Sequence, residues 1–371
     1  MADPERAPQA APLSRLLERH QIVVCTGSGG VGKTTTAAVM AMEAARQGQR
    51  ACVVTIDPAR RLANAMGLAG LTDTPSRVDG PWSGELWALM LDTKSTFDAL
   101  VEKNSTDEAQ AQRILTNRFY RNISGALSGT QEYMAMEKLF ELHDEGGFDL
   151  IVVDTPPTRN ALDFLEAPKR LTRFLDHRLY RMLVAPSGGL ARAVNMAAQT
   201  FLRTVSKVVG AEVVGDTIEF FNAFEGMEEG FKERAAAVVK LLSDERTAFV
   251  LVTAPRRDVV DEATFFAGKL QEAAIPVRAL IVNRVHPHFT SARREVLEGR
   301  ATTHAGTPLG SLYANLAEFT GVAATEEAHL SGLASRVAPA PVVRVPFLAT
   351  DVHDLEGLDR IAHHLFAPNA P

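Results

Sequence analysis

The chain has 371 residues, of which 46% are hydrophobic, and a formal net charge of −6. This length suits one large α/β domain with a helical insertion, or two modest domains. A mildly acidic chain has no general excess of the positive charge that nucleic-acid binding requires, so no nucleic-acid partner is expected. No apolar run reaches the roughly 20 residues that cross a bilayer, and the Ala/Pro-rich N-terminus has no signal-peptide core. We expect a cytoplasmic protein with a disordered leader over residues 1–18.

Seven short apolar runs, many of them rich in β-branched residues, predict buried parallel strands. In chain order they are Ile22–Thr26, Cys52–Ile56, Leu86–Leu91, Leu150–Asp154, Ala248–Thr253, Ala279–Asn283 and Val342–Pro346. Helical stretches lie between these runs, and this alternation is typical of a doubly wound, mostly parallel sheet flanked by helices. The sequence therefore predicts the α/β fold class.

Two of the intervals between predicted strands are much longer than the others, and both have helical patterns. Apolar residues recur at helical spacing in three stretches, namely Gln131–His143, Leu190–Val209 and Arg234–Leu242. We expect a helical subdomain inserted at about 95–145 and 160–245, within a domain that spans residues 19–368. In the second insertion, Asp216–Gly230 carries several Phe residues among acidic ones, and a core-facing helix is the commoner explanation of such a segment.

Neither the cysteines nor the histidines predict a metal site. Cys25 and Cys52 lie in predicted strands, where a buried apolar thiol is the ordinary interpretation. Four histidines occur in close pairs, namely His286, His288, His363 and His364. Residues two apart in a loop, or adjacent on a helix, do not present one face to a single ion. A solvated surface is the expected environment of these histidines.

A phosphate-binding loop follows the first predicted strand. Its sequence is Gly27-Ser28-Gly29-Gly30-Val31-Gly32-Lys33-Thr34, followed by Thr35, and it fits G-x-x-x-x-G-K-[ST] at every fixed position. The glycines let backbone N–H groups surround phosphates, and the next helix points its positive N-terminus at them. Lys33 adds a charge for the β- and γ-phosphates, and the Thr34 hydroxyl can ligate Mg²⁺. This context favours ATP and Mg²⁺ binding over a glycine-rich turn without nucleotide.

Two aspartates follow predicted strands on the ligand-binding edge of the sheet. Asp154 ends Leu150–Asp154, where it can hold Mg²⁺ directly or through water. Asp57 follows Cys52–Ile56 and precedes Pro58, which favours an extended conformation of Asp57. The Asp57 carboxylate could then reach the γ-phosphate and orient water. Capping of the following helix is an equally good explanation of Asp57.

Three segments together resemble the nucleotide motifs of the arsenite-pump and tail-anchored-protein-targeting ATPases. They are Gly29–Thr35, Thr55–Ala59 and Asp154–Thr158. This family belongs to the deviant-Walker ATPases, and the Asp57-Pro58-Ala59 match separates it from the related positioning ATPases MinD and ParA. The resemblance implies a P-loop Mg-ATPase whose subunits dimerise over ATP, with closure of the dimer coupled to a client or membrane partner. A positioning ATPase of the MinD or ParA type is a weaker alternative.

The resemblance also assigns roles to single residues. It implies that Asp57 polarises the attacking water and that Lys33 holds the phosphates. It implies that Asp154 begins a nucleotide-sensitive segment, that Asn283 reads adenine and that the backbone at Pro346 flanks the base. For Asn283, a turn residue at the end of a strand is the alternative interpretation.

One position departs from the family pattern in a way that affects catalysis. The family usually has a lysine at the loop position of Ser28, and that lysine crosses the dimer interface to the partner's phosphates. A serine supplies no such charge. The chain is therefore expected to form either a homodimer without this contribution or a heterodimer with a homologous subunit that carries the lysine, as in actinobacterial-type paralogue pairs. A regulatory subunit with little hydrolysis is the alternative function, and Arg60 or Arg61 is a candidate to replace part of the charge.

The helical insertion raises the question of a client. No cysteine follows Cys52, so metalloid binding through thiolates is not expected. By resemblance to the targeting ATPases, Phe221, Phe224 and Met227 are candidates to contact a hydrophobic client helix. Ordinary core packing is the commoner role of such residues.

Overall fold

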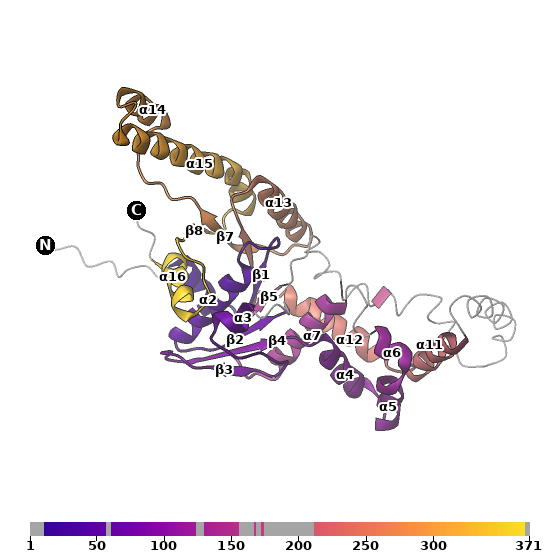
Figure 1. The fold of residues 1–371 in the computed structure, drawn as a ribbon. Helices are drawn as coiled ribbons and strands as arrows, with labels where there is room; N and C mark the ends of the chain where they lie inside the picture. Colours follow the sequence, from indigo (N-terminus) through magenta and orange to yellow (C-terminus); the bar gives the residue numbers. More distant parts are fainter. Residues whose placement is uncertain are drawn as a thin grey trace. The chain divides into compact units, whose positions relative to one another are not determined.

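The computed structural model describes residues 11–56, 61–123, 130–155, 167, 172–173 and 211–367 (Figure 1). Contacts between Cα atoms divide the chain into two compact units. The sheet unit comprises Met1–Met90, Leu142–Leu162 and Ser243–Pro371, and the helical unit comprises Leu91–Glu141 and Asp163–Leu242.

The sheet unit is built on eight strands in the order β3-β4-β2-β5-β1-β6-β7-β8. Their bounds are β1 Ile22–Thr26, β2 Arg50–Thr55, β3 Ser76–Val78, β4 Glu85–Met90, β5 Leu150–Asp154, β6 Thr247–Thr253, β7 Val277–Val285 and β8 Val342–Pro346. Every neighbouring pair is parallel except β3 and β4. All residues of β1, β5 and β6 are buried, as expected where helices cover both faces of a parallel sheet. The predicted α/β fold class is confirmed.

The antiparallel edge strand β3 was not among the seven predicted strands. Its three residues, Ser-Arg-Val, are too few and too polar to produce a hydrophobic run. The other seven strands each overlap a predicted run, with ends that differ by up to two residues.

Helix α2 (Lys33–Arg46) lies at the centre of the core and contacts β1, β2, β4 and β5. It also contacts three further helices, namely α1 (Pro12–Arg19), α3 (Arg61–Ala65) and α16 (Leu355–Phe366) (Figure 1). Ten of the residues of α2 are buried, and many are alanines, which let the helix approach the sheet closely. Helix α13 (Arg257–Glu272) contacts β6 and β7.

The N-terminal segment differs from the expected disordered leader. Residues 12–19 form helix α1, and its Leu13, Leu16 and Leu17 are buried in the core with α2 and α16. These leucines are spaced i, i+3 and i+4, so they form one apolar face of a helix. The expectation of disorder is therefore wrong for residues 12–18, and residues 1–10 lie outside the described part of the chain.

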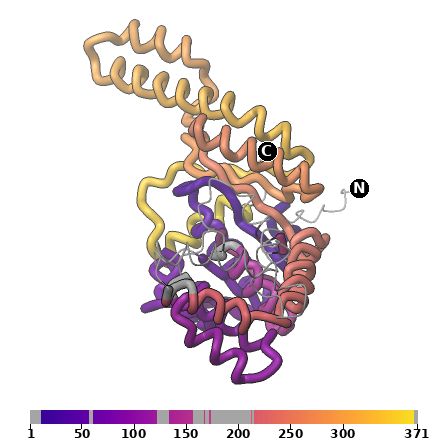
Figure 2. Tube along the Cα trace, turned by 90° about the vertical axis from the view of Figure 1, so that its right-hand side faces the viewer, coloured from indigo at the N-terminus to yellow at the C-terminus, as the bar shows by residue number. Residues whose placement is uncertain are grey.

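A long helical hairpin follows β7. It consists of α14 (Arg294–Thr303) and α15 (Pro308–Val337), a helix of 30 residues. Both views show α14 and the first half of α15 projecting away from the sheet, whereas α13 lies beside the second half of α15 (Figures 1 and 2). This hairpin was not among the elements predicted from the sequence.

The helical unit contains helices from both insertions. They are α4 (Thr93–Asn104), α5 (Glu108–Thr116), α6 (Arg118–Ile123), α7 (Thr130–Asp144, whose end belongs to the sheet unit), α11 (Ala211–Ala223) and α12 (Glu228–Leu242). The predicted helices Gln131–His143 and Arg234–Leu242 fall within α7 and α12, whereas Leu190–Val209 lies outside the described residues.

Aromatic rings form the core of the helical unit. The rings with centroids 5.0–6.2 Å apart belong to Phe97, Phe119, Tyr120, Phe220, Phe221, Phe224 and Phe231. The three residues considered as client contacts, Phe221, Phe224 and Met227, are 9%, 5% and 1% exposed. They are core residues, which is the commoner role of such residues.

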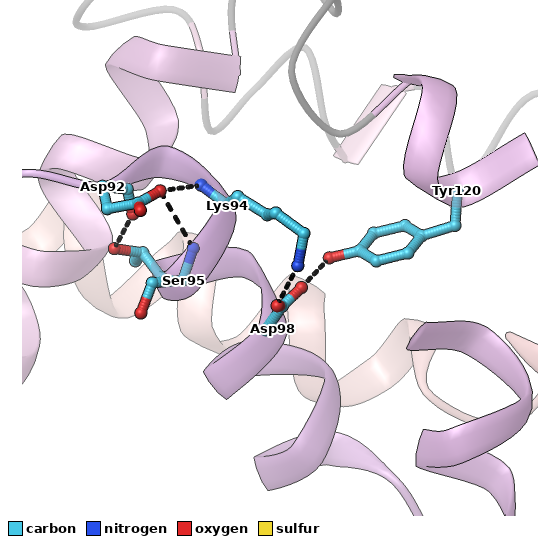
Figure 3. A network of polar contacts seen from close by, with 6 residues as sticks. Asp92, Lys94, Ser95, Asp98 and Tyr120 are labelled. Carbon is cyan, nitrogen blue, oxygen red and sulfur yellow. Dashed lines mark hydrogen bonds and ion pairs between the residues drawn. The ribbon is translucent and has the colours of Figure 1, made fainter. Parts of the chain in front are cut away.

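A polar network joins α4 to Tyr120, one of the aromatic residues of this core (Figure 3). Asp92 caps α4 by accepting hydrogen bonds from the backbone N–H groups of Lys94 and Ser95. Asp98, one helical turn after Lys94, accepts hydrogen bonds from the Lys94 ammonium and from the Tyr120 hydroxyl. Burial and this hydrogen bond to Asp98 raise the pKa of Tyr120, so its phenol stays neutral and joins α6 to α4.

No helix within the described ranges has both the length and the apolar character needed to span a membrane.

Candidate functional site

The glycines of the loop between β1 and α2 are required by its shape. Gly27 has φ +151°, and a Cβ built on it would lie 2.0 Å from the Val252 carbonyl oxygen of the neighbouring strand β6. Gly32 has φ +97°, and a Cβ there would lie 2.3 Å from Asn283 Nδ2. A side chain at either position would therefore collide with its neighbour, in addition to the backbone strain. Gly30, with φ +74°, has open space around it.

Lys33, the first residue of α2, turns back over this loop. Its Nζ donates a hydrogen bond to the Ser28 carbonyl oxygen at 2.9 Å, and the residue is only 6% exposed. A buried ammonium thus lies where the loop meets the N-terminus of a helix, and the backbone N–H groups of that first turn carry partial positive charge. This arrangement fits the phosphates of a nucleotide.

A carboxylate and two hydroxyls meet beside the loop. Asp154, at the end of β5, is 1% exposed, and its Oδ2 accepts hydrogen bonds from Thr34 Oγ1 at 2.7 Å and Thr55 Oγ1 at 2.9 Å. The strand order explains this meeting, because β5 lies between β1 and β2 and all three run parallel. Hydroxyl and carboxylate oxygens are the ligands that Mg²⁺ prefers, so Thr34 and Asp154 fit the ion beside a phosphate.

The surroundings of Asp154 extend to β1. Burial, together with the negative charge of Asp154, raises the pKa of Cys25, so this thiol stays neutral. Thr155 Oγ1 donates to the Cys25 carbonyl oxygen at 2.9 Å and ties the start of the segment after β5 to β1. Within the described part of the chain, no three His, Cys, Asp or Glu side chains are grouped to hold a metal ion.

Strand β7 supports the loop from the other side. Asn283 Nδ2 donates to the Val31 carbonyl oxygen at 2.8 Å, across 252 residues of sequence. Arg284 Nη1 donates to the Gly30 carbonyl oxygen at 3.2 Å. Arg284 has φ +61°, a left-handed backbone conformation that costs a non-glycine residue about 1–2 kcal/mol. Arg284 was not among the predicted site residues, because its only signal in the sequence is its position next to Asn283.

The structure brings most of the predicted site together, but not all of it. The contacts above join the loop from Gly27 to Gly32 with Lys33, Thr34, Asp154 and Asn283. Thr35 follows them in the first turn of α2. Asn283 contacts the loop backbone, which is a different contact from the adenine contact implied by the resemblance. Pro346 ends β8 and pairs with Val285 of β7, so it lies next to the strand that supports the loop. Asp57 and residues 58–60 lie outside the described residues.

His286 is not simply a solvated histidine, which corrects the expectation from the sequence. Its Nδ1 lies 2.7 Å from Glu326 Oε1, and its backbone N–H donates to Glu326 Oε2 at 2.9 Å. Its ring also stacks on Phe347, with 6.0 Å between centroids and 10° between planes. These contacts fasten the residues after β7 to α15. The other three histidines of the close pairs are exposed, as expected.

Comparison with known proteins points in one direction. The family model described as anion-transporting ATPase matches residues 20–306. A protein of Aquifex aeolicus named as an arsenical pump-driving ATPase is 25% identical over 283 residues, covering 73% of this chain and 83% of the relative. ATPase GET3B of Arabidopsis thaliana is 28% identical over 285 residues, covering 71% of this chain and 64% of that protein. ATPase GET3C of the same plant is 26% identical over 295 residues, covering 72% and 69%.

Proposed function

This chain belongs to the anion-transporting ATPase family and is an ATPase, and we propose that it is a cytoplasmic Mg-ATPase whose nucleotide state opens and closes a dimer, formed with a second copy of the chain or with a homologous subunit. The observation that carries the proposal is the joining of the phosphate loop to a buried carboxylate through the Thr34–Asp154 hydrogen bond. One element binds phosphate and the other suits the metal ion that accompanies ATP.

In the proposed reaction, water attacks the γ-phosphate in line with the leaving ADP. Lys33 and the backbone N–H groups of the loop hold the phosphates and stabilise the charge that develops on their oxygens. Bound Mg²⁺ would neutralise phosphate charge, with Thr34 as a ligand and Asp154 as a direct or water-bridged one. Asp57 is proposed to orient the attacking water. Asn283 and the backbone at Pro346 are proposed to flank the adenine.

The helical unit is proposed to serve the partner rather than the nucleotide. We assign it to a helical subdomain inserted at about 95–145 and 160–245 into an ATPase domain spanning 19–368. A hydrophobic client helix or a membrane protein is the proposed partner class. Because Phe221, Phe224 and Met227 are buried within the unit, the client surface would be formed by other residues.

A second candidate function is that of a nucleotide-binding regulatory subunit with little hydrolysis of its own. Ser28 favours it. The residue is 9% exposed in the loop, and its short neutral side chain cannot supply positive charge to a partner's phosphates. In this alternative, a homologous subunit with lysine at that position would perform most of the hydrolysis.

The test is to measure ATP binding and turnover of the purified full chain beside a matched pair of lysine variants. Lys33→Ala should weaken Mg-ATP binding by at least about 100-fold, because it removes a charged group from a desolvated phosphate site. Lys269→Ala is the control, since Lys269 is paired with Glu272 on the surface of α13. Binding with negligible turnover would favour the regulatory subunit. Absence of ATP binding by the unmodified chain would refute both functions.

A further inference from the structure

Large apolar side chains that are exposed to solvent are concentrated in one part of the described chain. Eight such residues occur among the described ranges, and seven of them lie between residues 289 and 347. These seven are Phe289, Val296, Leu309, Leu312, Phe319, Val322 and Phe347, and the eighth is Phe265. Exposed apolar side chains that gather on one face of a folded chain indicate a binding surface.

The pattern along α15 explains the concentration. An apolar residue recurs at alternating intervals of three and four, which is the heptad spacing of a coiled-coil seam. The seam consists of Leu309, Leu312, Leu316, Phe319, Ala323, Glu326, Leu330, Leu333 and Val337. Glu326 is its one polar member, and this residue is engaged by His286. The seam therefore runs along the whole of α15.

The two halves of the seam differ in their surroundings. In the half near the sheet, Leu330, Leu333 and Val337 are 1%, 1% and 6% exposed, and α13 contacts α15. In the half that projects from the sheet, Leu309, Leu312 and Phe319 are 46%, 64% and 45% exposed. We call Leu309, Leu312, Leu316 and Phe319 the distal seam. The same pattern of residues is thus covered at one end of the helix and uncovered at the other.

Helix α14 does not cover the distal seam, because it packs on another side of α15. A Cβ at Gly310 would lie 3.2 Å from the carbonyl oxygen of Ala301 in α14. A Cβ at Gly321 would lie 2.7 Å from the guanidinium of Arg294, the first residue of α14. Neither glycine belongs to the seam, so the small residues mark the side of α15 that α14 occupies.

The charge of the hairpin segment restricts which class of partner can cover the distal seam. The segment from Arg284 to Val337 carries five arginines and five glutamates, within a chain whose formal charge is −6. Arg336 is the only Lys or Arg of α15, and it lies at the end nearest the sheet. Helices that lie on membranes, and surfaces that bind nucleic acid, are rich in Lys and Arg, so both occupants are disfavoured. A neutral segment meets no net repulsion from its own copy.

The exposed apolar area also favours a second copy of this chain as the partner. Phe289 and Phe347 lie beside the distal seam, because the ring centroid of Phe289 is 5.8 Å from that of Phe319 and the His286 ring contacts both Phe319 and Phe347. Together with Leu309, Leu312 and Phe319, they are about half exposed, which amounts to roughly 400–500 Å² on the scale of about 150–250 Å² for a whole aromatic side chain. A standard protein interface buries about 800 Å² on each partner, which this surface and its polar rim approach. A single helix would cover the distal seam only in part, whereas a second hairpin would match its whole width.

We infer that the distal seam of α15 is the surface on which a second copy of this chain docks, so that two hairpins pack seam to seam about a twofold axis. The inference rests on the dimer in the proposed function and adds the surface through which the subunits meet. It also fits the position of the hairpin, which follows β7, the strand that carries the Asn283 and Arg284 contacts to the phosphate loop.

The first test compares seam variants with an off-seam control. Leu312→Glu combined with Phe319→Glu should weaken dimerisation at least about 100-fold, because both carboxylates would be buried in an apolar interface. Ala314→Glu places the same group at an exposed position of α15 outside the seam and should leave the dimer intact. Dimerisation is measured by sedimentation with and without Mg-ATP, and ATP affinity is measured on the same samples. Loss of ATP binding by the unmodified chain would refute the proposed function, whereas dimerisation unaffected by the double substitution would refute only this inference.

The second test leaves the seam apolar, so it does not depend on the double variant folding. Cys25 and Cys52 are both buried, which makes an introduced surface cysteine the reactive thiol. Leu316→Cys, at the middle of the distal seam, should give a covalent dimer of the full chain when diamide is added as oxidant. Thr325→Cys, exposed on the same helix outside the seam, should give none. A monomeric protein, or equal cross-linking of the two variants, would overturn the inference.

Discussion

Buried polar groups are arranged differently in the sheet unit and in the helical unit. In the sheet unit, Lys33, Asp154 and Thr55 gather at the ends of parallel strands, where they meet the loop between β1 and α2. In the helical unit, Glu137 of α7 is 2% exposed and forms an ion pair with Arg234 of α12, whose guanidinium lies 4.1 Å from the Phe140 ring centroid. The first arrangement builds a site for a ligand, whereas the second fastens two helices to each other.

The apolar cores of the two units also differ, in the size of the side chains that fill them. Alanines and β-branched residues dominate the core around α2 and the sheet, and they allow the close backbone contacts that shape the loop. The helical unit relies on a cluster of large rings instead. Substitutions in the sheet unit should therefore act mainly through backbone fit, and substitutions in the helical unit mainly through lost volume. The following predictions test this difference.

The largest effect is expected from Phe231→Ala in the helical unit. Phe231 is fully buried, with its ring centroid 5.0 Å from that of Phe224 and 6.2 Å from that of Phe97. The cavity should lower the free energy of unfolding by about 3–5 kcal/mol. Hydrogen exchange should show lost protection in α4, α11 and α12, while β1 and β6 stay protected. Phe265→Ala, at a 54% exposed position of α13, is the control, with an expected change below about 0.5 kcal/mol. Equal loss of protection in the sheet would show that the two units unfold together.

The next effect is expected from Gly27→Ala in the sheet unit. The new Cβ would collide with the Val252 carbonyl oxygen and would also adopt φ +151°, so a loss of about 2–4 kcal/mol is expected in urea denaturation. Gly226 in the helical unit also has a positive φ, of +88°, but there is open space around it, so Gly226→Ala is the matched control. That variant should lose only about 1–2 kcal/mol, from backbone strain. Similar losses in the two variants would contradict the close fit of the loop against β6.

A smaller effect, on ligand rather than fold, is expected from Asp154→Asn. The amide keeps the shape but removes the negative charge that suits Mg²⁺. The gain in ATP affinity that Mg²⁺ provides over EDTA should fall about 10–100-fold, or about 1.4–2.8 kcal/mol. Asp258→Asn, at a surface position of α13 paired with Arg256, should keep the full Mg²⁺ effect. An unchanged Mg²⁺ effect in Asp154→Asn would exclude Asp154 from the metal site.

Arg284→Gly separates stability from function. Glycine adopts φ +61° freely, so the substitution removes the backbone strain of the folded chain. Glycine also raises the conformational entropy of the unfolded chain, which offsets part of this gain. The free energy of unfolding should therefore rise by up to about 1 kcal/mol. The lost hydrogen bond to the Gly30 carbonyl oxygen should loosen the loop and weaken ATP binding several-fold, or about 0.5–1.5 kcal/mol. Ala274→Gly, at φ +58° after α13, relieves similar strain away from the loop. Ala274→Gly should stabilise the chain and leave the ATP affinity unchanged. If Ala274→Gly lowered the ATP affinity as much as Arg284→Gly, the hydrogen bond from Arg284 to the loop would not explain the loss.

The smallest effect is a pH dependence confined to the helical unit. Burial raises the pKa of Glu137, although the neighbouring Arg234 opposes the change. The folded state then holds a proton more tightly than the unfolded state, so this contribution to stability is fully present below about pH 4.5 and declines as pH rises through the folded pKa. Urea unfolding of the chain and of Glu137→Gln at several pH values measures it. The stability of Glu137→Gln relative to the unmodified chain should increase with pH, and parallel profiles would show that Glu137 does not titrate in this range.

Much of the sheet and of the loop could be predicted, because their signals are local. The run Ile22–Thr26 followed by Gly27–Thr34 contains a strand, a loop and a helix start within a few residues. Strand β3 escaped prediction because three mostly polar residues form no run. Helix α1 escaped because an Ala/Pro-rich start masked the spacing of Leu13, Leu16 and Leu17. Asp57 stays a prediction, because the described residues do not include it.

By itself, the sequence determined the phosphate loop, the parallel strands that end beside it and the helical character of the insertions, because glycine spacing and apolar periodicity act over short distances along the chain. Only the tertiary structure decided which strand supports the loop, because Asn283 and Val31 are 252 residues apart and strand order sets their meeting. It alone also decided which half of the α15 seam is covered. A heptad pattern specifies an apolar stripe, whereas the position of α13 and α14 determines where that stripe meets protein and where it meets solvent.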